Sequence, residues 1–474
     1  MREHINRQSK TFLQAVLVFF LASALLRCGG DSDTHDSSVQ GSTSQQERKT
    51  FVITNNNGVP EDDKERLVEQ NLMKKMFEKK YPYITLEYDT WVFDPESFIA
   101  KMAGKTATDV IGVFATEGAK VIEKKLAADI TELVRNWELY PYVNKELIAP
   151  FTREDRMYGV PFGGMGGAYV MTLFYNKEMF KKAGIVDESG APLPPQTWQE
   201  FLEVAQKLTD QEKGVAGFGI LGDAQASGWH FLNWVWQSGG EFEKKIGARW
   251  VAVFDSPEAI RALQFIKDLR WKYNVLQRDI TANNDDMFEL FVSERIAMAI
   301  FTPEYLFYIV EKLKFPIEKI GICLLPAGPA GRFNQMGGSF LILNPLLPPE
   351  EQEAAFNVIT YNFDLEWIEA ACKLRQEQGR LVGIPSLPVF IPEYQQKIDA
   401  IIDSYRNVPS FSELMAEAVQ YVRPEPPFYA QNLYSQYLSP AVQKVLTDEK
   451  ADPEKIMKEA TKDFQARFLD KMKL

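Results

Sequence analysis

The sequence predicts an α/β protein of two lobes joined by several crossings, with a ligand cleft between the lobes. The chain of 474 residues is long enough for more than one hydrophobic core. Its early part alternates strand, helix and strand, which favours a parallel sheet. The segment 157–180 carries a glycine cluster between two extended runs, where the backbone can bend or approach a ligand closely. A glycine-rich loop within a single sheet is the simpler alternative.

The N-terminal segment has the layout of a secretory signal. Basic residues precede an apolar run, 12–26, which is too short to span a membrane comfortably. Arg27 and Cys28 follow the run, and this ending resembles a lipoprotein signal, in which the cysteine is lipidated and becomes the mature N-terminus. Arg27 stands where such signals carry a small residue, and an uncleaved anchor is the alternative. We therefore expect a signal peptide at 1–27 and lipidation of Cys28.

A polar segment follows the predicted signal. Residues 28–50 are rich in Gly, Ser, Thr, Asp and Gln and contain almost no apolar side chain. Such a segment cannot bury enough surface to order itself. We expect it to be a flexible tether.

The first lobe is expected at 51–158 and 304–362. A short apolar strand, 51–54, is followed by a turn with Asn55 and Asn56, then by a helix and a second strand. Ligands of parallel sheets bind beyond the carboxyl ends of the strands, so these two asparagines are placed to hydrogen-bond a ligand. The alternative is that they only build the turn and cap the helix.

The second lobe is expected at 159–303 and 363–474. Asn176 and Thr197 are predicted to cap helices, because each side chain can accept a backbone N–H of the first turn. The end of the chain, 441–474, has the pattern of amphipathic helix and is expected to serve packing.

Composition excludes several classes of protein. The net charge of −12 argues against nucleic-acid binding, which needs a basic face. Three histidines and no metal-type cysteine spacing argue against a zinc site, and no cofactor or metal is expected. For Cys323 and Cys372, two buried thiols are favoured over one disulfide.

Several segments carry a family resemblance. "YGVPF" at 158–162, "LFYNKEMFKKAGI" at 173–185 and "PPQTWQEFLEVAQKLT" at 194–209 resemble the extracellular solute-binding proteins of bacterial ABC importers, in the large sugar-binding branch. The order and spacing of such segments extend over roughly 50–470. The resemblance implies the two-lobed periplasmic-binding-protein-like fold of type II, with hinge crossings between the lobes.

The resemblance also implies roles for particular residues. Trp229 lies where the family places an aromatic ring that stacks on a sugar, and Thr116 lies where it places a polar ligand contact. Glu117 is the neighbour of Thr116, and a carboxylate can accept two sugar hydroxyls; its alternative is a solvated charge at a helix N-terminus. At the return crossing, family members offer an aromatic side chain, and Glu304 with Tyr305 stand at that offset. Gly337 and Gly338 resemble the strand entry where backbone approaches the sugar.

The resemblance implies a function without covalent chemistry. We expect a monomeric, lipid-anchored protein on the extracellular or periplasmic face of the cell membrane. It would capture a sugar or oligosaccharide by lobe closure and deliver it to the permease subunits of an ABC importer. A surface-anchored carbohydrate-active enzyme, or a binder of peptides or other solutes on the same fold, is the alternative.

Overall fold

The computed structural model describes residues 49–91, 93–163, 168–223, 226–247, 249–426 and 428–472. Residues 49–474 form one compact unit. No helix in these described ranges is long and apolar enough to cross a membrane. The predicted signal peptide, Cys28 and most of the predicted tether lie outside the described residues.

The first lobe is built on a mixed sheet with the strand order β15-β14-β3-β1-β2, and β6 and β7 also pair with β14. β1 runs parallel to β2 and β3, as the strand–helix–strand pattern predicts, whereas β14 runs antiparallel to β3. The strands are β1 (Phe51–Asn55), β2 (Ile84–Tyr88), β3 (Val110–Phe114), β6 (Val160–Pro161), β7 (Ala168–Val170), β14 (Asn334–Leu343) and β15 (Val422–Pro424).

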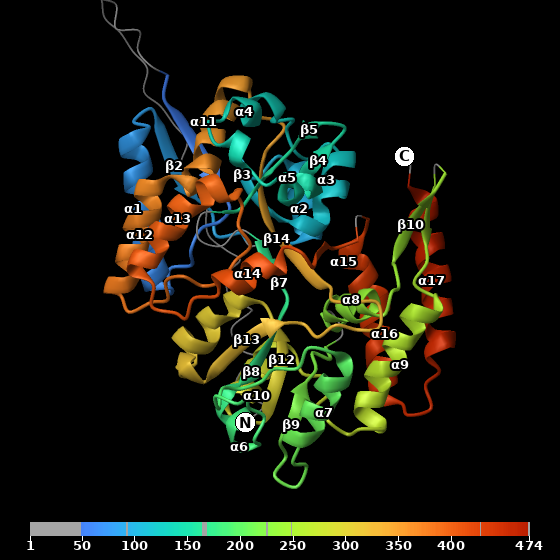
Figure 1. The fold of residues 1–474 in the computed structure, drawn as a ribbon. Helices are drawn as coiled ribbons and strands as arrows, with labels where there is room; N and C mark the ends of the chain where they lie inside the picture. The colour runs from blue at the N-terminus through green and yellow to red at the C-terminus, as the bar shows by residue number, and fades with distance from the viewer. Residues whose placement is uncertain are drawn as a thin grey trace, which may run out of the picture. The chain divides into compact units, whose positions relative to one another are not determined.

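Helices cover the first sheet and enclose its core (Figure 1). Phe77 of α1 is fully buried against residues of α11 and α12 in this core. Asp63 caps α1 by accepting the N–H of Arg66. The helices of this lobe include α1 (Lys64–Lys80), α2 (Pro95–Gly104), α3 (Gly118–Glu123), α4 (Thr131–Asn136), α5 (Lys145–Ile148), α11 (Pro349–Thr360), α12 (Leu365–Glu377) and α13 (Pro392–Tyr405).

The second lobe has its own sheet, with the strand order β13-β8-β12-β9. β12 is parallel to β9 and antiparallel to β8. Its strands are β8 (Thr172–Asn176), β9 (Ala216–Gly219), β12 (Ile296–Phe301) and β13 (Ile320–Leu324). Its helices include α6 (Lys177–Lys182), α7 (Trp198–Leu208), α8 (Ser227–Gln237), α9 (Pro257–Trp271), α10 (Asn284–Val292), α16 (Ser439–Thr447) and α17 (Pro453–Arg467).

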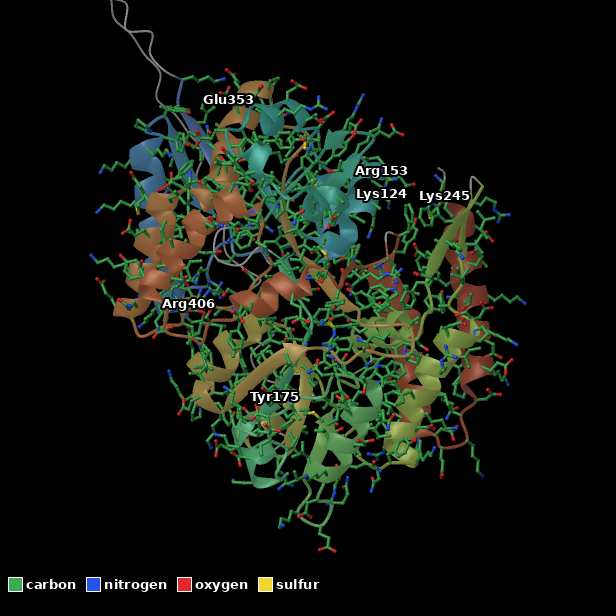
Figure 2. The ribbon with its side chains drawn as sticks, in the orientation of Figure 1. Lys124, Arg153, Tyr175, Lys245, Glu353 and Arg406 are labelled. Carbon is green, nitrogen blue, oxygen red and sulfur yellow. The ribbon has the colours of Figure 1, made fainter. Side chains whose placement is uncertain are left out.

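The motif that carried the resemblance folds as its residue types predict. Asn176 caps α6 by accepting the N–H groups of Glu178 and Met179 at 3.0 and 3.1 Å, which confirms the predicted cap. The ring of Tyr175, labelled in Figure 2, lies against Gly321 of β13, where an added Cβ would be 2.0 Å from the ring. Asn176 therefore begins α6 directly after β8, and the ring of Tyr175 packs closely against the neighbouring strand β13.

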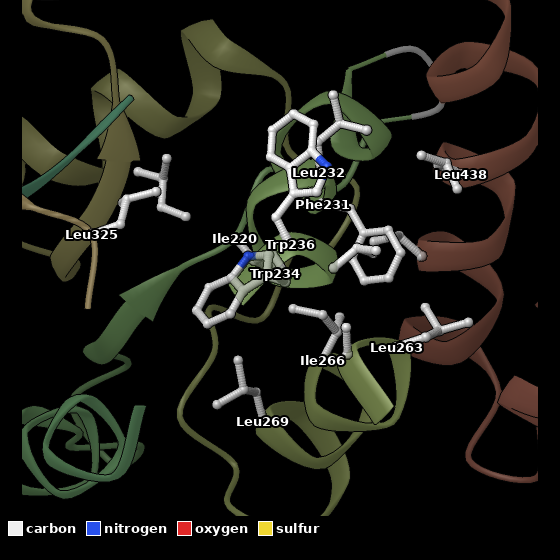
Figure 3. Packing of buried hydrophobic residues seen from close by; sticks show 14 of the residues in the cluster. Ile220, Phe231, Leu232, Trp234, Trp236, Leu263, Ile266, Leu269, Leu325 and Leu438 are labelled. Atoms are coloured by element: carbon white, nitrogen blue, oxygen red, sulfur yellow. The ribbon is translucent and has the colours of Figure 1, made fainter. Parts of the chain in front are cut away.

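The aromatic stretch after Trp229 forms α8, and most of it is core. Trp234 and Trp236 are 3% and 2% exposed; Trp234 packs against Phe265 of α9, and Trp236 packs against Phe242 (Figure 3). His230 is also buried, and burial lowers the pKa of its imidazole to about 3, so the ring is neutral. Only Trp229 of the three tryptophans on α8 is partly accessible.

The chain changes lobes at different places from those expected. β13, expected in the first lobe, pairs with β8 in the second sheet. α12 and α13, expected in the second lobe, contribute to the core of the first. All five residues of β13 are buried, so its pattern fits either sheet, and pairing with β8 decides its place.

The two cysteines lie in different cores. Cys323 belongs to the core around α8 and α9, and Cys372 belongs to the core around α1 and α12. Both are buried, and they do not pair with each other, in agreement with the favoured expectation.

Of the four glycines in the cluster 163–167, Gly163 is the one that the structure describes. At Gly163 an added Cβ would be 2.1 Å from the ring of Phe363, so close packing requires glycine there. Gly164, Gly166 and Gly167 lie outside the described residues.

Candidate ligand-binding site

A cavity of about 780 Å³ lies between residues of the two lobes. Its size is in the range of small-molecule sites. The first lobe contributes the turn after β3, together with β7, β14 and the segment that follows α12; the second contributes α8, α10 and the return crossing after β12.

Five of the nine residues predicted to bind ligand line this cavity: Thr116, Trp229, Glu304, Tyr305 and Gly338. They come from the 3₁₀ turn η1 (Ala115–Glu117), α8, the 3₁₀ turn η4 (Pro303–Tyr305) and β14. The tertiary structure brings together residues that are more than 200 positions apart in the sequence. Their contact with a ligand stays a prediction.

The asparagines at the end of β1 do not line the central cavity. Asn56 is 4% exposed; its Oδ1 accepts the N–H of Gly112 at 2.7 Å, and its Nδ2 donates to the carbonyl of Trp91. Oδ1 of Asn55 accepts from the backbone N–H and the Nδ2 of Asn57. Asn55 lines a smaller neighbouring cavity of about 320 Å³. In this structure the two side chains hold the strand end together, as the turn alternative predicts.

Glu117 and Gly337 also lie beside the central cavity without lining it. Glu117 is 5% exposed and forms an ion pair with Lys120 at 3.1 Å. Gly337 makes room for Tyr169, because an added Cβ would be 2.2 Å from the tyrosine hydroxyl. Gly338 therefore lines the cavity itself, whereas Gly337 leaves space for the ring of Tyr169, which also lines the cavity.

Sequence reasoning missed several residues that line the cavity, among them Tyr169, Glu425 and Tyr434. Tyr169 stands in a strand-like run, and Glu425 stands in a proline-rich loop. The aromatic residues of that loop pack elsewhere, Phe428 against Trp250 and Tyr429 against Phe468. No local pattern marks Glu425, because its neighbours in the site come from distant segments.

Two contacts set the orientation of the Trp229 ring. Its Nε1 donates to Oε1 of Glu425 at 2.8 Å, and Gln335 Nε2 donates to the same oxygen at 2.6 Å. The ring of Tyr169 meets the Trp229 ring edge to face, with centroids 5.7 Å apart and an angle of 87°. A tryptophan held by its edge in this way is suited to present a ring face to the cavity.

Arginines lie at another part of the cavity wall. Arg66, Arg375 and Arg380 line the central cavity and the smaller one beside it. Glu69 of α1 accepts from Arg375 and Arg380, with shortest distances of 2.7 and 2.6 Å. Glu311 lies 3.5 Å from Nε of Arg380. The guanidinium groups of Arg375 and Arg380 are therefore neutralised by carboxylates, and Arg66 is exposed.

Comparison with known proteins identifies the family. The sequence profile described as bacterial extracellular solute-binding protein matches residues 61–345, more than half of the chain. The chain belongs to the bacterial extracellular solute-binding proteins. A putative binding protein of Brucella abortus is 25% identical to it over 358 residues, which cover 73% of this chain and 78% of the relative.

Solved structures share the two-lobed fold of this solute-binding protein. An ABC transporter solute-binding protein from Thermotoga lettingae, bound with α-D-tagatose, has a TM-score of 0.68 at 24% identity and covers 88% of this chain and 98% of its own. The GacH receptor of Streptomyces glaucescens has a TM-score of 0.70 at 19% identity, with 90% of this chain and all of its own covered. The expected fold class is confirmed.

Two carboxyl groups in the central cavity of this solute-binding protein have raised pKa values. Burial raises the pKa of Glu425 to about 7 and that of Glu304 to about 7. Burial raises the pKa of the Tyr169 hydroxyl well above its ordinary value, and the nearby Glu425 and Glu304 carboxyl groups raise it further. The centre of the cavity therefore holds carboxyl groups that change charge near neutral pH.

The Glu425→Gln variant tests whether the buried carboxyl of Glu425 has a raised pKa. A carboxyl whose pKa is higher in the folded than in the unfolded chain binds more protons when folded. Its contribution to the free energy of unfolding therefore falls as pH rises from about 4.5 to about 7. Since Trp229 and Gln335 both donate to Oε1 of Glu425, a glutamine oxygen can accept these two hydrogen bonds. At pH 8 the variant is expected to exceed the wild type in free energy of unfolding by about 1–3 kcal/mol.

Urea unfolding between pH 5 and pH 8 measures this difference. Glu87→Gln, which changes an exposed carboxyl on β2, is the control and should keep the wild-type pH slope. An equal slope in Glu425→Gln and wild type would contradict the burial of a titrating carboxyl at this position.

Proposed function

We propose that this protein is the extracellular binding subunit of an ABC importer and captures a sugar or oligosaccharide in its central cavity. The arrangement of Trp229 with Glu425 and Tyr169 carries the proposal. An aromatic face covers the apolar C–H surface of a pyranose, and carboxylates accept its hydroxyl groups. The solved relatives support the sugar class, because the Thermotoga lettingae protein holds α-D-tagatose and Thermotoga maritima MalE3 holds maltose.

Lobe closure is the proposed mechanism. Thr116, Tyr169 and Gly338 belong to the first lobe, whereas Trp229, Glu304 and Tyr305 belong to the second. A ligand that contacts both sets favours the closed conformation, since the full set of contacts exists only there. Asn55, Asn56, Glu117 and Gly337 are proposed to support these contacts from behind.

The remaining parts of the proposal concern anchoring and partners. We propose that the chain is a monomer that is lipidated at Cys28, tethered to the membrane by the polar segment and docked on permease subunits. We propose two domains, each of which is one lobe built around one of the two sheets. The protein is proposed to bind without catalysing a reaction.

Thermal unfolding of the compact unit from residue 49 onward tests the ligand class. The panel contains mono- and oligosaccharides together with peptides. A ligand present at a hundred times its dissociation constant is expected to raise the free energy of unfolding by about 2.7 kcal/mol. This corresponds to an increase in Tm of a few degrees. A shift with peptides alone would overturn the sugar assignment.

A hydrolase is the competing candidate because Glu304 and Glu425 are two carboxyl groups in one cavity. Release of reducing sugar from glycans, lost in both Glu304→Gln and Glu425→Gln, would favour this candidate. Stoichiometric binding with no change in the bound saccharide would favour the importer subunit.

A further inference from the structure

A second cavity of about 330 Å³ adjoins the central one. Five residues line both cavities: Thr116, Ala168, Gly338, Ser339 and Glu425. The second cavity, here called the side cavity, extends from these residues into the first lobe, towards α3, α5 and the segment after β15. A group attached to a ligand in the central cavity can therefore reach it.

The side cavity differs from the central cavity in its chemistry. Small and apolar side chains from separate segments dominate its wall, including Ala115, Ala119, Leu147, Pro150, Met336 and Pro426. Arg153, labelled in Figure 2, and Glu146 are exposed residues of the same wall. The guanidinium of Arg153 lies over the ring of Phe428, 5.9 Å from its centroid.

An apolar wall selects against hydroxyl groups. A sugar ring placed there would give up hydrogen bonds with water and find few partners, which costs free energy. An apolar group would instead be removed from water at a gain that grows with its buried area. A pocket of this size with a mainly apolar wall, beside a candidate ligand site, is suited to an apolar group of the ligand.

We propose that the side cavity binds an apolar substituent of a saccharide held in the central cavity. The ligand class is then a glycoside that carries an aryl or short alkyl aglycone. The inference rests on the proposed function. Size supports it, because a dry apolar cavity of about 150 Å³ is enough for benzene.

Calorimetric titration with matched glycosides tests the proposal. The probes are the methyl and phenyl D-glucosides and D-galactosides, each as α and β anomer. The phenyl glycoside of the preferred sugar is expected to bind about ten- to a hundredfold more tightly than its methyl glycoside, because the phenyl ring buries more apolar area.

Variants at Ala119 test whether the higher affinity for phenyl glycosides arises in the side cavity. Ala119 lies on α3, lines the side cavity and does not line the central one. The ratio of phenyl to methyl affinity is expected to fall in Ala119→Val and to approach one in Ala119→Phe, because the added side chains fill the space. Lys124→Phe is the matched control, since Lys124 is exposed at the end of the same helix and lines neither cavity.

The outcomes separate this inference from the proposed function. Equal affinity for methyl and phenyl glycosides, or a ratio that Ala119→Phe leaves at the wild-type value, would overturn the side-cavity assignment while sugar binding stands. Should Ala119→Phe not fold, the ratio in Ala119→Val decides. No binding by any saccharide would overturn the proposed function and this inference with it.

Discussion

Glu69→Ala is expected to lower the free energy of unfolding by about 3–5 kcal/mol, because it leaves two enclosed arginines with Glu311 as their remaining carboxylate. Three hydrogen bonds of 2.7 to 3.1 Å join Glu69 to Arg375, and one of 2.6 Å joins it to Arg380. The side chains of Glu69 and Arg380 are only 13% and 8% exposed, so water can replace little of the lost interaction. Urea unfolding at pH 7 measures the loss.

The same variant makes a pH prediction. Burial alone would raise the pKa of Glu69, but Arg375 and Arg380 bring it below its ordinary value. A carboxyl with a depressed pKa stabilises the fold above its unfolded pKa of about 4.5 and loses that contribution as pH falls through the folded value. The difference between wild type and Glu69→Ala is therefore expected to shrink below about pH 4.5.

Glu454→Ala is the control for the enclosed network. It removes a pair with Lys458 in which both side chains are more than half exposed, and such pairs contribute little to the free energy of unfolding. A loss of similar size in Glu69→Ala and Glu454→Ala would contradict the assignment of an enclosed ion-pair network.

Trp229→Ala is expected to weaken saccharide binding by about thirtyfold or more, the effect of removing a central aromatic contact. The ring lines the cavity, and the contacts with Glu425 and Tyr169 already fix its orientation before a ligand arrives. Little entropy is then lost when a sugar stacks on it. Calorimetric titration with the saccharide that gives the largest thermal shift measures the change.

Trp229→Phe separates stacking from orientation. Phenylalanine keeps a flat ring but cannot donate to Glu425, so its affinity is expected to lie between those of wild type and Trp229→Ala. Trp271→Ala is the control, because Trp271 lies on α9, donates to the carbonyl of Val445 and does not line the central cavity. Unchanged affinity in Trp229→Ala would remove Trp229 from the binding site.

Much of the local structure could be predicted because its causes lie within a few residues. Asn176 and Thr197 cap helices as their side-chain oxygens predict. The strand–helix–strand start gives parallel β1 and β2. Trp229 could be placed in the cavity from the order of family motifs, although Trp234 and Trp236 share its helix and its residue type.

The sequence by itself determined the α/β class, the parallel start and the helices that begin after Asn176 and Thr197, because hydrophobic periodicity and capping are local, and the resemblance of its motifs implied the two lobes. Only the tertiary structure decided that β13 pairs with the second sheet, that Asn55 and Asn56 bond to their own lobe, and that Glu425 meets Trp229 across 196 residues of sequence. Such contacts depend on which buried surfaces pack together and which polar groups then need hydrogen-bond partners. The residues next to a position in the chain do not determine either of these.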